Sequence, residues 1–342
     1  MIRSFAIISF VILVAISSAQ GQTKLRGFMV ARGIQPSDIE VLKTWKVNSI
    51  RYPLEWLAGV DSANEEEYAE WLEQALLTFD AILPALSEAN IKVVLNLYSP
   101  PGGFSNNPAC SSSQKLFCNG WTQSAFIEAW QKITTRYKDN ATIYGFDLVN
   151  EPAFRKAAPG LMDWNTLAIE ATKAIRQIDP TRHVIIEPPF GDLFRMNQIK
   201  PVPFQNISYS PHFYYPLSFQ HQGLYGRKLG VKYPNKNFNK KLLAEKLARV
   251  VAFQKKNKGA RIYFGEFSAV RWAPGNSAFQ YLKDLISIFE KRGWDWSYHA
   301  FRESDAWSLE HDGNIKNKAP ATKTTARLKL MQGFFNKNKF PP

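Results

Sequence analysis

The stretch IYGFDLVNEP (residues 143–152) decides how the rest of the chain is interpreted. Its apolar, strand-like run stops at Asn150 and Glu151, and a proline follows. The stretch RIYFGEFS (residues 261–268) has the same form, with Glu266 where its apolar run stops. Each stretch has the length and composition of a buried strand, so each predicts a strand that ends in a carboxylate.

Short apolar runs of this kind alternate with helical patterns along the chain. Strands are expected over 25–30, 47–52, 91–97, 143–149, 183–187, 207–211, 261–266 and 294–300. Helices are expected over 36–46, 65–89, 121–138, 164–178, 239–257, 276–292 and 320–335, and 188–206 is expected to be irregular with one short helix. This alternation predicts an α/β fold, a single (β/α)8 TIM barrel. The alternative, an open doubly wound sheet, would need an early glycine-rich phosphate turn, and the sequence has no GxGxxG or GxxxxGK[ST].

Polar residues follow most of these strands at their carboxyl ends, where barrel enzymes carry their catalytic groups. They are Arg51, Asn96, Tyr98, Asn150, Glu151, Glu187, His212, Tyr214, Glu266, His299 and Arg302. Ordinary solvation explains one polar strand end, but seven such ends together favour a site.

Glu151 and Glu266 would end strands four and seven, which face each other across a barrel mouth. Glycoside hydrolysis needs two carboxyl groups on either side of the scissile bond, one as acid and one as nucleophile or stabiliser. The alternative is that each glutamate only forms an ion pair at the barrel rim. The neighbours favour catalysis, because Asn150 can bond a sugar hydroxyl, and Arg51 and Tyr214 can orient and ionise Glu266.

With these residues in place, the chain resembles glycoside hydrolase family 5, the cellulase-like retaining (β/α)8 hydrolases. The resemblance runs from about Leu25 to the end of the barrel and is carried by NSIRYPL (48–54), DLVNEP (147–152), SPHFYYP (210–216) and YFGEFS (263–268), in that order. It implies a β-linked glycan as substrate, cleaved by a two-glutamate double displacement.

The resemblance also implies roles for individual residues. Glu151 resembles the acid/base and Glu266 the nucleophile, while Asn150 resembles the partner of the sugar 2-hydroxyl. Arg51 and Tyr214 resemble the groups that keep the nucleophile ionised, and His212 resembles a hydrogen-bond donor in the site.

Two positions depart from the family pattern. Tyr98 stands at the end of strand three, where members usually have His, and His299 stands on strand eight, where members usually have the Trp of the sugar platform. Trp296 and Trp307 are candidate replacements for that platform, and each can equally be a core residue. Since both changes concern the reacting subsite, we expect a poor fit to plain 1,4-linked cellulose and a preference for another β-linked glycan.

Other chemistries find little support in the sequence. It contains no GxSxG or HExxH, and its five histidines lack metal spacing, so we expect neither a metal nor a cofactor. A transglycosylase on the same scaffold and a non-catalytic carbohydrate-binding barrel remain open alternatives. Product analysis at high acceptor concentration separates the first from a hydrolase, and release of reducing sugar excludes the second.

The amino terminus has the pattern of an export signal: Arg3, then an apolar run over 5–16 and small residues at 17–19. We expect residues 1–19 to be a signal peptide and residues 20–342 to be one catalytic domain, secreted or periplasmic and without a membrane span. Export favours a disulfide between Cys110 and Cys118, which share one polar loop.

The net charge of +14 is concentrated, because residues 227–261 hold twelve Lys or Arg and one acid. Basic proteins often bind nucleic acid, but here the charges fall on the polar face of a helical pattern without interleaved aromatic residues. We therefore expect a glycan substrate, no nucleic-acid partner, and a monomer.

Overall fold

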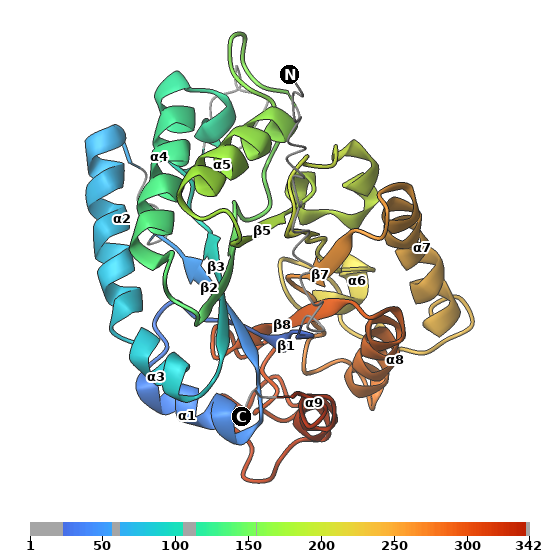
Figure 1. Cartoon of the computed structure of the whole chain (residues 1–342). Helices are drawn as coiled ribbons and strands as arrows, with labels where there is room; N and C mark the ends of the chain where they lie inside the picture. The colour runs from blue at the N-terminus through green and yellow to red at the C-terminus, as the bar shows by residue number, and fades with distance from the viewer. Residues whose placement is uncertain (1–22, 57–61, 105–113, 155, 340–342) are drawn as a thin grey trace, which may run out of the picture.

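The structure is a computed structural model that describes residues 23–56, 62–104, 114–154 and 156–339. Its strands pair in parallel and in sequence order, and β8 returns to β1, so the sheet closes into a barrel (Figure 1). The strands are β1 (Arg26–Val30), β2 (Ser49–Leu54), β3 (Lys92–Leu97), β4 (Ile143–Asp147), β5 (His183–Ile186), β6 (Ile207–Tyr209), β7 (Arg261–Phe264) and β8 (Asp295–Phe301). The predicted (β/α)8 barrel and all eight predicted strands are confirmed.

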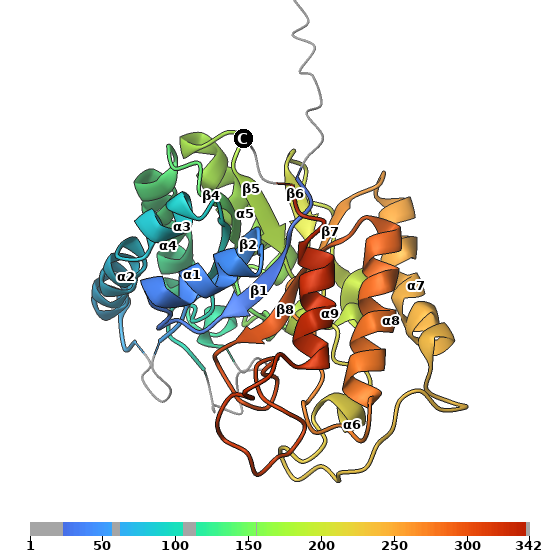
Figure 2. The ribbon, with the colours of Figure 1, turned by 90° about the horizontal axis from the view of Figure 1, so that it is seen from below.

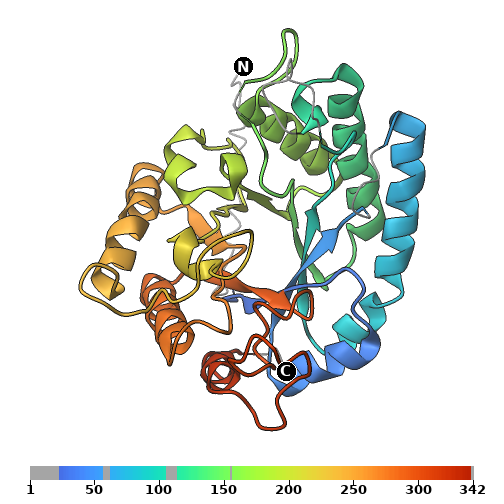
Figure 3. The same ribbon diagram turned by 180° about the vertical axis from the view of Figure 1, so that it is seen from behind.

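Helices surround the barrel on its outer side, as Figures 1 and 3 show from opposite directions. They are α1 (Pro36–Thr44), α2 (Glu65–Asp80), α3 (Leu83–Glu88), α4 (Gly120–Tyr137), α5 (Trp164–Ile178), α6 (Leu217–Gln220), α7 (Lys240–Lys256), α8 (Ser277–Arg292) and α9 (Ala326–Phe335). Short 3-10 turns lie at η1 (Lys115–Phe117), η2 (Pro189–Gly191) and η3 (Leu193–Gln198). The last three outer helices, α7, α8 and α9, follow one another along one side of the barrel (Figure 2).

The helix expected over 65–89 is wrong in one respect, because it is two helices. Helix α2 ends at Asp80 and α3 begins at Leu83, with Pro84 in its first turn. A proline lacks the N–H that would bond the carbonyl four residues earlier, which here belongs to Asp80, so one continuous helix cannot pass through it. The short helix α6 was not expected from the sequence.

The apolar core has two parts. A small cluster inside the barrel consists of Leu25, Val94, Ile185 and Tyr263. Leu25 directly precedes β1, and the other three lie on β3, β5 and β7, so this layer comes from alternate strands, as barrel packing requires. The larger part fills the space between the strands and the helices.

Some predictions fall outside the described residues. The signal peptide over 1–19 and Cys110 lie there, so export and the Cys110–Cys118 disulfide stay predictions. Within the described residues, no helix combines the length and apolar content needed to cross a bilayer.

Candidate active site

Arg51 on β2 is the centre of the candidate site. Its guanidinium group is fully buried and binds three carboxylates: Asp147 Oδ2 at 2.7 Å, Glu187 Oε1 at 2.6 Å and Glu266 Oε1 at 2.7 Å. It also donates to Asn150 Oδ1 at 3.0 Å. Burial opposes a charge here, but the surrounding carboxylates raise the pKa of Arg51 well above its usual value. One cation therefore links the ends of β2, β4, β5 and β7.

Glu266, just beyond β7, is held as a carboxylate. Arg51 binds its Oε1, and the Tyr214 hydroxyl donates to its Oε2 at 2.8 Å. Burial alone would raise the pKa of Glu266, but the positive charges of His212, His299 and Arg51 outweigh that effect. Together with the Tyr214 hydrogen bond, they lower the pKa to about 2. The group is thus ionised at any pH at which the protein is expected to work.

Glu151 follows β4 and, unlike Glu266, is not bound by Arg51 or Tyr214. Its side chain is 42% exposed, and its Oε1 lies 2.8 Å from His212 Nδ1. Desolvation raises its pKa, and the negative charges of Glu266 and Glu187 add to that rise, whereas contact with His212 opposes it. The pKa of one carboxyl group is raised and that of the other is lowered, which is the division of labour that an acid and a nucleophile need.

The backbone at Glu151 is also held in place. Its φ angle is +42°, in the left-handed region that non-glycine residues rarely adopt. Its N–H donates to Glu187 Oε2 at 2.8 Å, so the carboxylate that binds Arg51 also fixes this turn. Glu187 therefore positions the acid candidate without facing the substrate.

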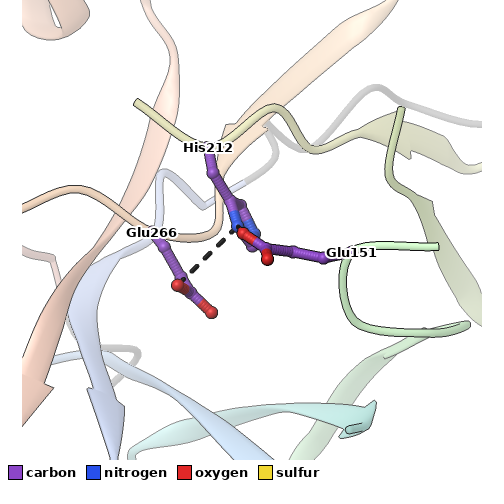
Figure 4. A group of neighbouring side chains, drawn as sticks. All are labelled: Glu151, His212 and Glu266. Atoms are coloured by element: carbon purple, nitrogen blue, oxygen red, sulfur yellow. Dashed lines mark hydrogen bonds and ion pairs between the residues drawn. The ribbon is translucent and has the colours of Figure 1, made fainter. Parts of the chain in front are cut away.

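His212 lies between the two glutamates, as Figure 4 shows. Its Nδ1 is 2.8 Å from Glu151 and 3.7 Å from Glu266, and its Nε2 is 3.3 Å from Glu187. Burial would lower the pKa of His212, but these carboxylates raise it well above its usual value. A carbon at the Cβ position of Gly191 would lie 2.8 Å from His212 Nδ1, so only glycine fits beside the ring.

The two catalytic candidates are close together. One atom each of Glu151, His212 and Glu266 lies within 4.8 Å of the others (Figure 4). Such a group can in principle hold a cation, but the Arg51 guanidinium 2.7 Å from Glu266 repels one. The same spacing brings two carboxyl oxygens close enough to act on one glycosidic bond.

Comparison with known proteins identifies the family of this chain. The sequence profile described as Cellulase (glycosyl hydrolase family 5) matches residues 17–305. This chain belongs to glycoside hydrolase family 5. It is a glycoside hydrolase, as its sequence predicted.

Curated relatives agree with this assignment, and a solved structure shows the same fold. Endoglucanase C of Acetivibrio thermocellus is 26% identical over 298 residues, which cover 78% of this chain and 84% of that protein. Cellodextrinase A of Ruminococcus flavefaciens is 22% identical over 268 residues, 76% of either chain. A structure of Thermotoga maritima Cel5A in complex with mannotriose has the same fold, with a TM-score of 0.71 at 22% identity over 90% of this chain and 97% of that one.

The two residues that depart from the family 5 pattern both lie near Glu266. Burial raises the pKa of Tyr98, and the charge of Glu266 adds to the rise. The His299 ring packs against Tyr214, with ring centroids 6.1 Å apart, and its Nε2 pairs with Glu303 Oε2 at 2.9 Å. Burial lowers the pKa of His299, but Glu266 and Glu303 raise it above its usual value.

The structure separates the two tryptophans that were candidate sugar platforms. Trp296 is fully buried on the outer side of the barrel, where it packs against Phe335 of α9 and donates to Glu290. It is a core residue. Trp307 packs against His299 with ring centroids 5.0 Å apart and is only 7% exposed, so it supports His299 rather than offering an open face.

Sequence reasoning did not assign roles to three residues of this site. Glu187 was noted only as a polar strand end, and Asp147 and Gly191 were not singled out. The sequence did contain a signal for Glu187, because a charged residue directly after the apolar run Val184–Ile186 must find a partner when it is buried. No local pattern indicated which cation that partner would be.

Proposed function

We propose that this chain hydrolyses β-glycosidic bonds of a β-glucan or a related oligosaccharide with retention of anomeric configuration. The observation that carries the proposal is the approach of Glu151 and Glu266 to within 4.8 Å through their nearest oxygens. Retaining glycosidases hold the two carboxyl groups about 5–5.5 Å apart, while inverting enzymes leave about 6.5–9.5 Å for a water molecule. The names of the relatives, an endoglucanase and a cellodextrinase, support a glucan as substrate.

In the proposed reaction, Glu266 attacks the anomeric carbon while Glu151 gives its proton to the leaving oxygen. The glycosidic C–O bond breaks, and a glycosyl ester forms on Glu266. Glu151, now a carboxylate, then removes a proton from water, which attacks the ester and restores both groups. Asn150 is oriented by Arg51 through its side-chain oxygen, which leaves its amide N–H groups for a sugar hydroxyl.

The stereochemistry of the first product tests this mechanism. We expect proton NMR of a β-linked cello-oligosaccharide digest to show the β-anomer before mutarotation. A 2-deoxy-2-fluoro glycoside with a good leaving group should add one glycosyl unit to Glu266, detectable by mass spectrometry of the peptide. Initial appearance of the α-anomer would exclude the retaining mechanism.

The proposal favours a hydrolase over the two alternatives. Membership of a hydrolase family, together with two differently tuned glutamates, argues against a non-catalytic binding barrel. In transglycosylation, a sugar would attack the same glycosyl ester in place of water. Product analysis at high acceptor concentration therefore measures what fraction of the ester is transferred to a sugar.

We further propose that residues 20–342 act as one exported, monomeric domain with a Cys110–Cys118 disulfide. A secretory pattern at residues 1–19 supports export. Thiol titration of the denatured, unreduced protein should find no free thiol, and sedimentation should give a mass of one chain. Two titratable thiols would contradict the disulfide.

A further inference from the structure

A cavity of about 370 Å³ lies between the end of β2 and helix α2. On the helix side it is lined by Trp71, Gln74, Ala75 and Thr78, whose spacing places them on one face of α2. Helix α2 lies on the outer side of the barrel (Figure 1). None of the catalytic candidates lines this cavity, so it belongs to the flank of the barrel beside the mouth.

Two tryptophans form an aromatic wall in this cavity. Trp56, which follows β2, stacks on Trp71 of α2 with ring centroids 4.9 Å apart and an angle of 13° between the ring planes. The buried ring of Tyr68 packs against Trp71 at 5.2 Å, and the Trp56 backbone N–H donates to Ser99 Oγ at 2.8 Å. Both tryptophans are only half-buried. The wall is therefore held in place and still reaches solvent.

The polar groups of this cavity have no partner within the described parts of the chain. The side chains of Arg32, Glu55 and Gln74 all line it, and each lacks a hydrogen bond or ion pair to another described residue. The indole N–H groups of Trp56 and Trp71 are unpaired in the same sense. Most other tryptophans of this protein donate that group to an acceptor of the protein. Unpaired polar groups that meet beside an aromatic wall are typical of a ligand site.

The chemistry of the lining suits a neutral sugar. Glu55 and Arg32 are the charged residues of the cavity, and their charges balance. An aromatic wall can cover the apolar C–H face of a sugar ring. A carboxylate accepts hydrogen bonds from hydroxyl groups, a guanidinium donates them, and the Gln74 amide does both. The volume falls within the range of about 300–1,000 Å³ that is usual for small-molecule sites.

Glu55 links this cavity to the barrel mouth. Burial raises the pKa of Glu55, and the negative charge of Glu303 adds to the rise, so the two carboxylates are neighbours. Glu303 in turn pairs with His299 at 2.9 Å, and His299 packs against Tyr214 of the candidate active site. A glycan chain that lies across the mouth can therefore reach the cavity.

We propose that this cavity is a second binding site for the β-glucan, separate from the residues that cleave the bond. The proposal rests on the proposed function for the identity of the glycan. The site holds one stretch of a long chain while another stretch lies between Glu151 and Glu266. It thereby raises the affinity for polymers, because the two stretches are linked, and takes no part in bond cleavage.

Binding of a polymer to the Glu266→Gln variant tests the proposal without turnover. Affinity electrophoresis in gels that contain a soluble mixed-linkage β-glucan gives the dissociation constant. Adding Trp71→Ala should weaken binding about tenfold, because the aromatic wall is lost. Adding Gln74→Ala should weaken it about threefold, the effect of one lost hydrogen-bonding group.

The same substitutions in the wild-type background should leave catalysis on a short substrate unchanged. We expect kcat/KM for 4-nitrophenyl β-cellobioside to stay within about twofold, because this substrate is too short to occupy both sites. Leu77→Ala is the matched control, since Leu77 lies on the same helix and is 48% exposed but does not line the cavity. It should change neither polymer binding nor kcat/KM.

Circular dichroism and thermal unfolding check the fold of each variant. Gln74 is exposed, so Gln74→Ala keeps the test decisive if Trp71→Ala does not fold. Absence of polymer binding, or polymer binding that is unchanged in the folded variants, would overturn the proposal. A parallel loss of kcat/KM on the short substrate would also overturn it, because the cavity would then be part of the catalytic site.

Turnover of 4-nitrophenyl β-cellobioside by the wild-type protein tests the proposed function separately. Absence of that turnover would contradict the proposed function, whereas the dependence of polymer binding on Trp71 and Gln74 decides the second site.

Discussion

The two sides of the barrel mouth are built differently. On the side of β2, β4, β5 and β7, Arg51, Glu187, Glu266 and the Glu151 backbone are joined by contacts of 2.6–2.8 Å. On the side of β8, the His299 ring pairs with one carboxylate, that of Glu303, and its buried Nδ1 has no hydrogen-bond partner among the described residues.

The difference lies in how the charged groups of each side are bound. On the first side, Arg51 binds three carboxylates, and these contacts fix the charge and position of the candidate reacting groups. Among the described residues, buried polar atoms without a hydrogen-bond partner occur on both sides, such as His212 Nε2 on the first and His299 Nδ1 on the second. The first side matches the family 5 pattern except at Tyr98, which follows β3 between β2 and β4, and the second side carries the other departure, His299.

The largest expected effect comes from the first side. Glu266→Gln should reduce kcat by at least about 10⁴-fold, because no covalent intermediate can form, while circular dichroism and thermal unfolding show a retained fold. Glu73→Gln is the control, since Glu73 only pairs with Lys132 and Arg136 on the surface. Activity of Glu266→Gln within a few-fold of wild type would reduce Glu266 to a rim ion pair.

Glu187→Gln should lower kcat by about 10²-fold although Glu187 does not face the substrate. The amide still fills the space, but it loses the charge that binds Arg51 and His212 and that contributes to the raised pKa of Glu151. Small displacements of reacting groups carry penalties of this size.

The pH profile distinguishes positioning from simple destabilisation at Glu187. The charge of Glu187 raises the pKa of Glu151. Removal of that charge should therefore lower the pKa of the acid and move the alkaline limb of kcat/KM to lower pH. A variant that loses thermal stability but keeps both the wild-type kcat and the wild-type profile would show that Glu187 is purely structural.

Gly191→Ala should reduce kcat by some tens of fold. Its φ angle is +61°, and an added Cβ would lie 2.8 Å from His212 Nδ1 and 2.9 Å from Glu151 Cγ. Gly160→Ala is the matched control, because Gly160 also has a positive φ, +83°, but open space around its Cβ position. Both variants should lose about 1–2 kcal/mol of stability from the backbone alone, and only Gly191→Ala should lose kcat. If the two variants had the same kcat, displacement of His212 and Glu151 by the added methyl group would not affect catalysis.

The smallest expected effect lies on the second side. His299→Trp should raise kcat/KM for unsubstituted 1,4-linked oligosaccharides relative to other β-glucans by several-fold, because a larger ring covers more of a sugar face. It should also move the acid limb of kcat/KM to higher pH, since the charge of His299 contributes to the lowered pKa of Glu266.

His299→Gln separates these two effects. It removes the same charge without adding a ring, so it should shift the acid limb and leave the substrate ratio unchanged. An unchanged ratio in His299→Trp would mean that His299 carries no specificity.

Much of this protein was predictable from its sequence because the signals are local. Apolar runs with polar ends predicted eight strands, and the barrel rule then placed Glu151 and Glu266 at one mouth. Pro84 was visible too, and closer attention to it would have divided the helix over 65–89 correctly, since the effect of proline on a helix is local.

The tertiary structure decided what depends on neighbours distant in the chain. Arg51 could be assigned to Glu266 from the family pattern, but its contacts with Asp147 and Glu187 required the barrel to close. The cavity between β2 and α2 likewise depends on the stacking of Trp71 on Trp56, which no sequence pattern links. Sequence determines which groups stand at strand ends, because propensity and periodicity act over a few residues. Protonation and pocket polarity arise from charges and surfaces that meet only in the folded chain.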